Sequence, residues 1–170
     1  MALPRTLRLF NVFVNGTEFV DEALELKLPK IAMKTEDYIG AGMPGTVKLL
    51  KSIESIELEH TYNGPLEVLI ADFGAEKHDA SLVRFMGSYS EEGSGTSQSV
   101  EIIVRGRHNE FDGGDAKGGE NGNWKVKTDC TYYKMSVDGK EWLEIDVVHK
   151  LFKVMGVDRL APHRKNVGML

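Results

Sequence analysis

Residues 124–145, WKVKTDCTYYKMSVDGKEWLEI, decide the fold. Two runs rich in β-branched and aromatic residues flank Asp138 and Gly139, a pair that tolerates the positive φ angles of a tight hairpin turn. The stretch therefore predicts an antiparallel β-hairpin. Residues 9–20, LFNVFVNGTEFV, repeat this arrangement around Asn15 and Gly16 and predict a second hairpin near the start of the chain.

Further strands are expected between and beside these hairpins. Residues 23–28 alternate, with Leu24, Leu26 and Leu28 on one face. In residues 56–62, apolar or ring-bearing side chains alternate with polar ones, and the polar face is strongly acidic because it carries Glu57 and Glu59. Extended runs are also expected at residues 31–37, 82–89 and 100–107.

One helix is expected in residues 63–74. Asn63 is a suitable N-cap and Gly74 a suitable C-terminal residue. Between them an apolar stripe has helical spacing, formed by Leu66, Leu69, Ile70 and Phe73. The fold class is thus mainly β, an antiparallel β-sandwich or barrel with one principal flanking α-helix. Residues 147–170 mix short extended and helical pieces without a clear assignment.

Length and composition indicate one domain, spanning residues 1–170. The hydrophobic fraction is 41% and the charged fraction 28%, both ordinary for a globular chain. The net charge is −5 and the basic residues are scattered, which argues against an electrostatic nucleic-acid binder. No apolar run approaches the roughly 20 residues that span a bilayer, so we expect no stable membrane insertion and a cytoplasmic protein.

The sequence contains no recognisable catalytic motif, and we expect neither an enzyme nor a cofactor. The single cysteine, Cys130, excludes an intrachain disulfide and lies in an alternating run typical of a buried thiol. No nucleophile elbow is present. The histidines lack metal-site spacing, and each is expected at the surface or its boundary: His60, His78, His108, His149 and His163.

A glycine-rich stretch at about residues 112–123 is expected to be a flexible loop. A phosphate-binding loop would need Lys followed by Ser or Thr at the start of a helix, whereas Gly119 is followed by Glu120. The carboxylates Asp112, Asp115 and Glu120 could suggest calcium, but the EF-hand order of ligands is absent.

Several phrases, taken in order over almost the whole chain, resemble the major tail tube family of contractile-tailed phages and R-type tailocins. In the first half they are Asn11-Val12-Phe13, Leu28-Pro29-Lys30, Tyr38-Ile39-Gly40-Ala41-Gly42-Met43 and Phe85-Met86-Gly87-Ser88-Tyr89. In the second half they are Arg105-Gly106-Arg107, Lys117-Gly118-Gly119-Glu120, Asp138-Gly139-Lys140-Glu141, Glu144-Ile145-Asp146 and Gly156-Val157-Asp158-Arg159-Leu160, followed by Arg164 and Gly168. One departure is Met155, which stands where the family pattern has asparagine before Gly156.

The resemblance implies a structural subunit that forms stacked hexameric rings, the inner tube of a contractile tail. Such a tube conducts DNA without binding it specifically, or punctures an envelope. The implied partners are further copies of the chain, the tail sheath protein, the tape measure protein inside the tube, and the baseplate and tail terminator proteins. The implied location is the virion tail, after assembly in the cytoplasm of the bacterial host.

Two hypotheses place residues in such a tube. Glu54, Glu57 and Glu59 are candidates for an acidic lumen that repels DNA, the alternative being a solvated outer face. A long loop at about residues 37–47 is a candidate inter-subunit contact through Tyr38, Ile39, Gly40, Gly42 and Met43, the alternative being that it folds back onto its own core.

A rival interpretation belongs to another class of protein. A monomeric β-barrel could bind a small ligand or a carbohydrate in its mouth. The two interpretations differ in whether purified protein forms rings or tubes, or stays a monodisperse monomer that binds a metabolite with a sharp thermal shift.

Overall fold

The computed structural model describes residues 2–169. This part of the chain is mainly β and antiparallel, as predicted. Its elements, in order, are β1 (Arg5–Val14), β2 (Thr17–Glu18), β3 (Ala23–Lys27), β4 (Met33–Tyr38), β5 (Val47–Ile53), β6 (Ile56–Tyr62), α1 (Glu67–Ala71), β7 (Ser81–Glu91), β8 (Ser97–Asp112), β9 (Trp124–Val137), β10 (Lys140–Asp146), β11 (Leu151–Val154), β12 (Val157–Asp158) and α2 (Ala161–Asn166).

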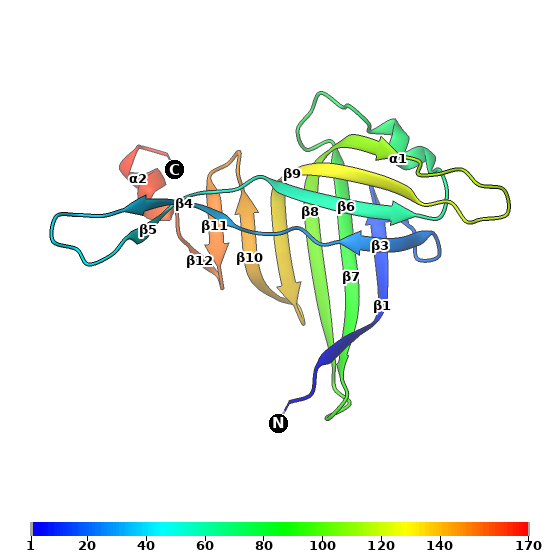
Figure 1. The fold of residues 1–170 in the computed structure, drawn as a ribbon, viewed down its shortest axis with the longest axis horizontal. Helices are drawn as coiled ribbons and strands as arrows, with labels where there is room; N and C mark the ends of the chain where they lie inside the picture. The colour runs from blue at the N-terminus through cyan, green and yellow to red at the C-terminus, as the bar shows by residue number, and fades with distance from the viewer. Residues whose placement is uncertain (1, 170) are drawn as a thin grey trace.

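Two layers share the long strands β8 and β9 (Figure 1). The main sheet has the order β12-β11-β10-β9-β8-β7-β1-β2. The second layer begins where β6 pairs with the first half of β9, residues 124–130, and β3 pairs with the other edge of β6. The second half of β9, residues 132–137, pairs instead with β10. One pair of strands therefore belongs to both layers of a sandwich.

The change of layer occurs at Gly106. Here the pairing of β8 with β9 shifts register between Arg105 and Gly106, and the pairing of β8 with β7 ends. A Cβ atom at this position would lie far inside contact distance of the backbone carbonyl of Asp129. Glycine lets the two backbones approach closely enough for both strands to bend together.

The core lies between the layers and is filled with side chains. Its buried members come mainly from β1, β7, β8 and β9 of the main sheet and from β6, among them Val12, Val83, Phe85, Ile102 and Leu58. Burial of each such side chain contributes about 1.5–3 kcal/mol to stability. The space enclosed among them has no room for a water molecule.

Three hairpins use the same turn. Both predicted hairpins are confirmed, and β11–β12 is a third, with positive φ at both central residues: Asn15 and Gly16, Asp138 and Gly139, Met155 and Gly156. Met155 has a φ of 51°, an unfavourable angle for a side chain that lacks the local hydrogen bonds of asparagine. The departure at Met155 therefore keeps the turn and strains it.

The predicted helix is much shorter than its apolar stripe. α1 begins after Leu66, not after Asn63, and only Leu69 of the stripe is buried, whereas Ile70 and Phe73 are about half exposed. The predicted flanking helix is present, with Leu66 and Leu69 packed against the core, but its predicted length was wrong, since five residues give too few turns to bury the whole stripe. Neither helix in residues 2–169 is long and apolar enough to cross a membrane.

The predicted strand at residues 23–28 forms as β3, but its apolar face is broken. A register shift between Ala23 and Glu25 displaces Leu24, which is exposed, while Leu26 remains half-buried against the core. The bulge thus overrides the simple alternation.

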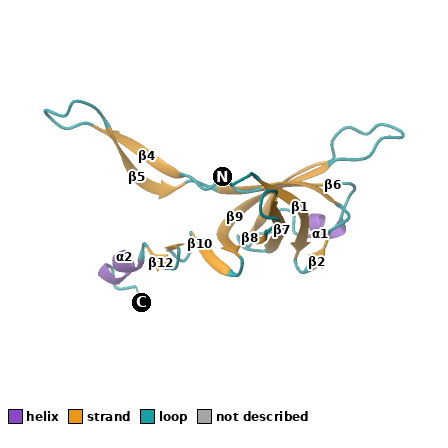
Figure 2. Cartoon of the chain, turned by 90° about the horizontal axis from the view of Figure 1, so that it is seen from below, coloured by secondary structure: helices purple, strands orange, loops and turns teal. Residues whose placement is uncertain are grey.

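Strands β4 and β5 form a separate two-stranded hairpin that leaves the body. Figures 1 and 2 show this hairpin and the loop of residues 113–123 projecting at opposite ends of the molecule. The hairpin continues β3 and β6 through residues 28–32 and 54–55, where the amide of Glu54 donates to the carbonyl of Ala32 at 2.8 Å. We call β4, β5 and residues 39–46 between them the arm.

Gly106→Ala tests the shared bend. The added methyl group has to displace the Asp129 carbonyl, so we expect the free energy of unfolding to fall by about 1–3 kcal/mol. Chemical denaturation measures the loss. Gly64→Ala is the control, because a Cβ there meets nothing within 4 Å, and it should change stability by less than about 0.5 kcal/mol. Equal stabilities for the two variants would contradict the role of Gly106.

Candidate functional site

The tip of the arm carries the five candidate contact residues and holds them away from the body. Gly42 has a φ of +83° and closes the loop. The amide of Gly40 lies 3.0 Å from the Met43 sulfur. Tyr38 and Ile39 remain 53% and 60% exposed. The loop packs on itself at the end of the arm, so the alternative in which it folds back onto its own core is wrong (Figure 2).

The strands of the arm expose apolar side chains on both faces. Leu49 pairs with Glu36 and Leu50 with Thr35, so the two leucines point to opposite faces. They are 40% and 65% exposed. A two-stranded hairpin of this kind is marginally stable in water unless something covers it.

Surface ion pairs tie the two strands of the arm together. Lys48 lies 3.2 Å from Asp37, and Lys51 lies 3.1 Å from Glu36. Such exposed pairs contribute little to stability. The arm is therefore formed as a hairpin within the subunit, while its apolar side chains remain exposed.

The three acidic lumen candidates lie together on one side of the second layer. Glu57 and Glu59 point outward from β6, opposite to its buried residues, and Glu54 lies just before the strand. They line a shallow concavity of about 340 Å³. Its lining also includes Lys27, Lys30 and Lys127.

The lining of this concavity is therefore charge-balanced, not strongly acidic. The Lys125 ammonium group lies 3.2 Å from the Glu59 carboxylate, and that hydrogen bond raises the pKa of Lys125. Lys127 lies 3.4 Å from Glu110 of β8. Reading β6 alone missed these lysines, because they come from β9, which is distant in sequence. In residues 124–130, Lys125 and Lys127 alternate with Val126 and Thr128, and this pattern could have placed both lysines on the outward face.

A hydrogen-bonded chain of polar side chains crosses the core. His60 Nδ1 lies 2.7 Å from the Tyr62 hydroxyl, and its Nε2 lies 2.9 Å from Thr128 Oγ1. The same threonine hydroxyl lies 2.7 Å from His108 Nδ1. A hydroxyl has one proton, so Thr128 can donate to at most one of the two rings; at least one of the two facing nitrogens therefore carries a proton, which links the tautomers of the two histidines.

Both core histidines are neutral because of their burial. His60 and His108 are at most 1% exposed, so the prediction that they lie at the surface was wrong. Burial, with a contribution from neighbouring His108, lowers the pKa of His60 to about 3, and burial lowers the pKa of His108 as well. His108 Nε2 has no hydrogen-bond partner among residues 2–169.

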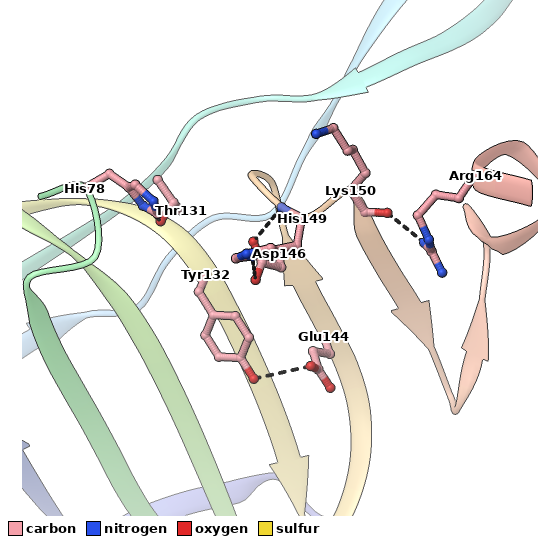
Figure 3. Close-up of polar contacts among 8 residues, drawn as sticks. All are labelled: His78, Thr131, Tyr132, Glu144, Asp146, His149, Lys150 and Arg164. Atoms are coloured by element: carbon pink, nitrogen blue, oxygen red, sulfur yellow. Dashed lines mark hydrogen bonds and ion pairs between the residues drawn. The ribbon is translucent and has the colours of Figure 1, made fainter. Parts of the chain in front are cut away.

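A second group of polar contacts lies around strands β9 and β10, near the turn that follows β10. In Figure 3, His78 lies 3.0 Å from Thr131, and His149 bonds Asp146 at 2.7 Å across the turn after β10. The Tyr132 hydroxyl reaches Glu144 at 3.4 Å.

The C-terminal helix is fixed by Arg164. Its guanidinium group donates to the carbonyl of Lys150 at 2.7 Å (Figure 3) and pairs with Asp158, which lowers the pKa of that carboxyl. Arg164 thus ties helix α2 to strand β12 and to the turn before β11, and each contact has an evident role in holding the chain. No nucleophile, base and oxyanion donor converge among them.

The remaining candidates show no chemistry of their own. Burial raises the pKa of the Cys130 thiol to about 12, as expected for an unreactive cysteine. The loop of residues 113–123 leads into strand β9, not into a helix, and Trp124 lies against two of its glycines. Within residues 2–169, no three His, Cys, Asp or Glu side chains are arranged to hold a metal ion.

The chain is similar to tail tube proteins along its whole length. Residues 4–168 match the family model described as phage tail tube protein FII. The tail tube protein of Escherichia phage P2 is 41% identical over 99% of this chain and 100% of its own. The major tail tube protein of Serratia phage KSP20 is 39% identical over 96% of this chain and 95% of its own.

Solved structures of contractile injection systems share the fold at low identity. A chain of the PVC sheath–tube complex in the extended state is 13% identical with a TM-score of 0.55, covering 75% of this chain and 88% of its own. A chain of the anti-feeding prophage baseplate is 12% identical with a TM-score of 0.57, covering 80% and 97%.

The buried histidines predict that acid destabilises the protein. Their pKa values are lowered on folding, so below about pH 6.5 the unfolded state binds more protons than the folded state. Stability should fall by about 1.4 kcal/mol per pH unit for His60 alone between about pH 6.5 and 4.5. Denaturant melts across this range measure the slope. His60→Leu should lower stability at about pH 7 and flatten the slope, whereas unchanged stability across the same range in the native chain would contradict the assignment.

Proposed function

The chain belongs to the phage tail tube protein FII family, and from that premise we propose that it is the repeating subunit of the inner tube of a contractile tail, assembled as stacked hexameric rings. The arm carries this proposal. It projects from the body with apolar side chains on both faces and none of its own chain to cover them, which suits insertion between copies.

Incomplete sheet edges support the same proposal. Strand β3 pairs only with β6 among the described strands, so its other edge is open. Open edges cause uncontrolled aggregation unless something completes them, and a closed ring of identical copies completes every edge. The tip residues Tyr38, Ile39, Gly40, Gly42 and Met43 then touch an adjacent subunit.

The outward face of the second layer lines the bore in this proposal. Glu54, Glu57 and Glu59 lie on this face, and neighbouring lysines partly neutralise their charge. Carboxylates on the strand positions of this face still outnumber cations, with Glu25, Glu57, Glu59, Glu110, Asp112 and Asp129 against Lys27, Arg107, Lys125 and Lys127. A weakly acidic wall repels the phosphate backbone without a strong field, so that DNA passes without sticking.

The proposed partners follow from this position. The sheath surrounds the tube, the tape measure protein occupies the bore before DNA, and the baseplate and tail terminator lie at its ends. The location is the virion tail, reached after assembly in the host cytoplasm. The role is structural and needs neither catalysis nor a cofactor.

The ligand-binding barrel has no comparable support. The cavity between the two layers that is lined by Leu26, Leu58, Val83 and neighbouring apolar side chains does not admit a water molecule. A ligand in the barrel would need a hollow interior of roughly several hundred Å³.

Substitutions at the tip of the arm should block polymerisation without unfolding the subunit. Ile39→Asp and Met43→Asp place a charge where an apolar contact is proposed, while Val148→Asp makes the same change at an exposed turn of the body. Electron microscopy should show tubes for the native chain and for Val148→Asp but not for the two tip variants. Melting temperatures should stay alike. Normal tubes from both tip variants would refute the contact.

The bore assignment can be tested with a thiol probe. Cys130 is buried and gives little background, so Glu57→Cys supplies one reactive thiol. In monomers, both a small maleimide and a maleimide carried on a bulky polymer should react with it. In tubes, only the small reagent should react, because the polymer cannot enter the bore. Reaction of the bulky reagent with assembled tubes would place Glu57 on the outside.

A further inference from the structure

The second layer is a four-stranded sheet with two open edges. Its order is β3-β6-β9-β8, formed by the first half of β9 and the end of β8. β3 forms one edge. The end of β8 forms the other, since β7 stops pairing at Gly106 and residues 73–74 contact β8 only at His108.

A row of alternating charges runs across this layer from edge to edge. Lys27 pairs with Glu59, Glu59 with Lys127, and Lys127 with Glu110 as directly opposite residues of neighbouring strands. Opposite residues of antiparallel strands share a face, so the four charges lie side by side. The row begins with a cation at the β3 edge and ends with an anion at the β8 edge.

The charges at the two ends of the row differ in whether they form an ion pair within the subunit. Glu110 has Lys127 at 3.4 Å. Within residues 2–169, Lys27 forms no ion pair with a carboxylate, because its neighbour Glu59 is engaged by Lys125 at 3.2 Å. The cation at the β3 edge is therefore available to an anion from outside the subunit.

Strand direction allows the row to continue into another copy. Each neighbouring pair in the layer is antiparallel, and four strands bring the direction back to its start. Strand β3 of one copy placed beside β8 of the next is therefore antiparallel too. Such a contact joins two different edges, so it is head to tail, the kind of contact that forms a ring when the rotation between neighbouring copies closes.

We infer that Lys27 of one copy pairs with Glu110 of the next, and that this pair sets the register between neighbouring subunits. The inference rests on the proposed self-assembly and specifies its contact. The alternation Lys, Glu, Lys, Glu then runs unbroken around the ring. A shift of one residue would turn Lys27 away from the row, so the charges oppose pairings that are one residue out of register, which backbone hydrogen bonds alone would exclude less strictly.

The same register brings two carboxylates together. Two residues from Lys27 and Glu110, Glu25 of one copy stands opposite Asp112 of the next. Lys125 compensates, because it lies opposite Asp112 within its own layer; Asp112 and Glu25 of its own copy add to the effect of Glu59 in raising the pKa of Lys125. The attraction between Lys27 and Glu110 therefore outweighs the repulsion between Glu25 and Asp112 along this edge.

Charge reversal tests the pair by complementation. Lys27→Glu sets like charges against each other at every interface, as does Glu110→Lys. Each single variant should raise the critical concentration for polymerisation about tenfold, equivalent to about 1.4 kcal/mol per interface. The double variant restores opposite charges and should return to within about threefold of the native value. The single-variant defects should shrink in about 1 M salt, where the screening length falls to about 3 Å.

Mixing the two single variants gives a second test. When they alternate around a ring, native pairs alternate with pairs in which both charges are reversed, so opposite charges meet at every interface. A one-to-one mixture should therefore assemble where neither variant assembles alone, and only into rings with an even number of subunits. Lys140→Glu and Glu76→Lys, which change exposed charges elsewhere, are the matched controls and should assemble normally.

The outcomes separate this contact from the proposed function. Rescue in the double variant and in the mixture supports the pair. Single variants that polymerise like the native chain, or that are rescued in neither way while their monomers melt normally, overturn it and leave the tube assignment standing. A native chain that forms no rings at any concentration overturns the proposed function itself.

Discussion

The close approach of two backbones at Gly106 is the constraint on which the architecture depends. Because β8 can bend there against β9, one pair of strands supplies the centre of the main sheet and the edge of the second layer. A side chain on residue 106 would clash with the backbone carbonyl of Asp129 in β9 and disturb the bend that the two strands share. The two-layered core and the outward charged face both follow from this local property of glycine.

The bend also explains why a polar chain crosses an otherwise apolar core. His60, Thr128 and His108 lie on three strands that come together just beyond the bend. Their mutual hydrogen bonds satisfy groups that would each be costly to bury alone, and those bonds need the right register of all three strands. A neutral, connected network in this position specifies one alignment of the second layer, which apolar side chains of similar size would specify less strictly.

The sequence predicted what is encoded locally. Turn residues placed both hairpins, and alternation placed β6 and the buried row that includes His60, although the same analysis assigned that histidine to the surface. The errors arose where tertiary contacts decide. The bulge beside Leu24 and the five-residue length of α1 depend on neighbouring strands. The lysines beside Glu57 and Glu59 were missed because strand pairing between β6 and β9 joins segments that are distant in the sequence.

The features that make the subunit incomplete are built from the same elements that make it stable. β3 and β6 carry the core on one face, yet they extend into an arm whose leucines and tip are uncovered, and within residues 2–169 they present an open edge that ends in an unpaired lysine. A monomer under selection for its own stability alone would shorten the arm and blunt that edge. The proposed self-assembly gives both features a physical reason, because one edge and its complement then occur on every copy.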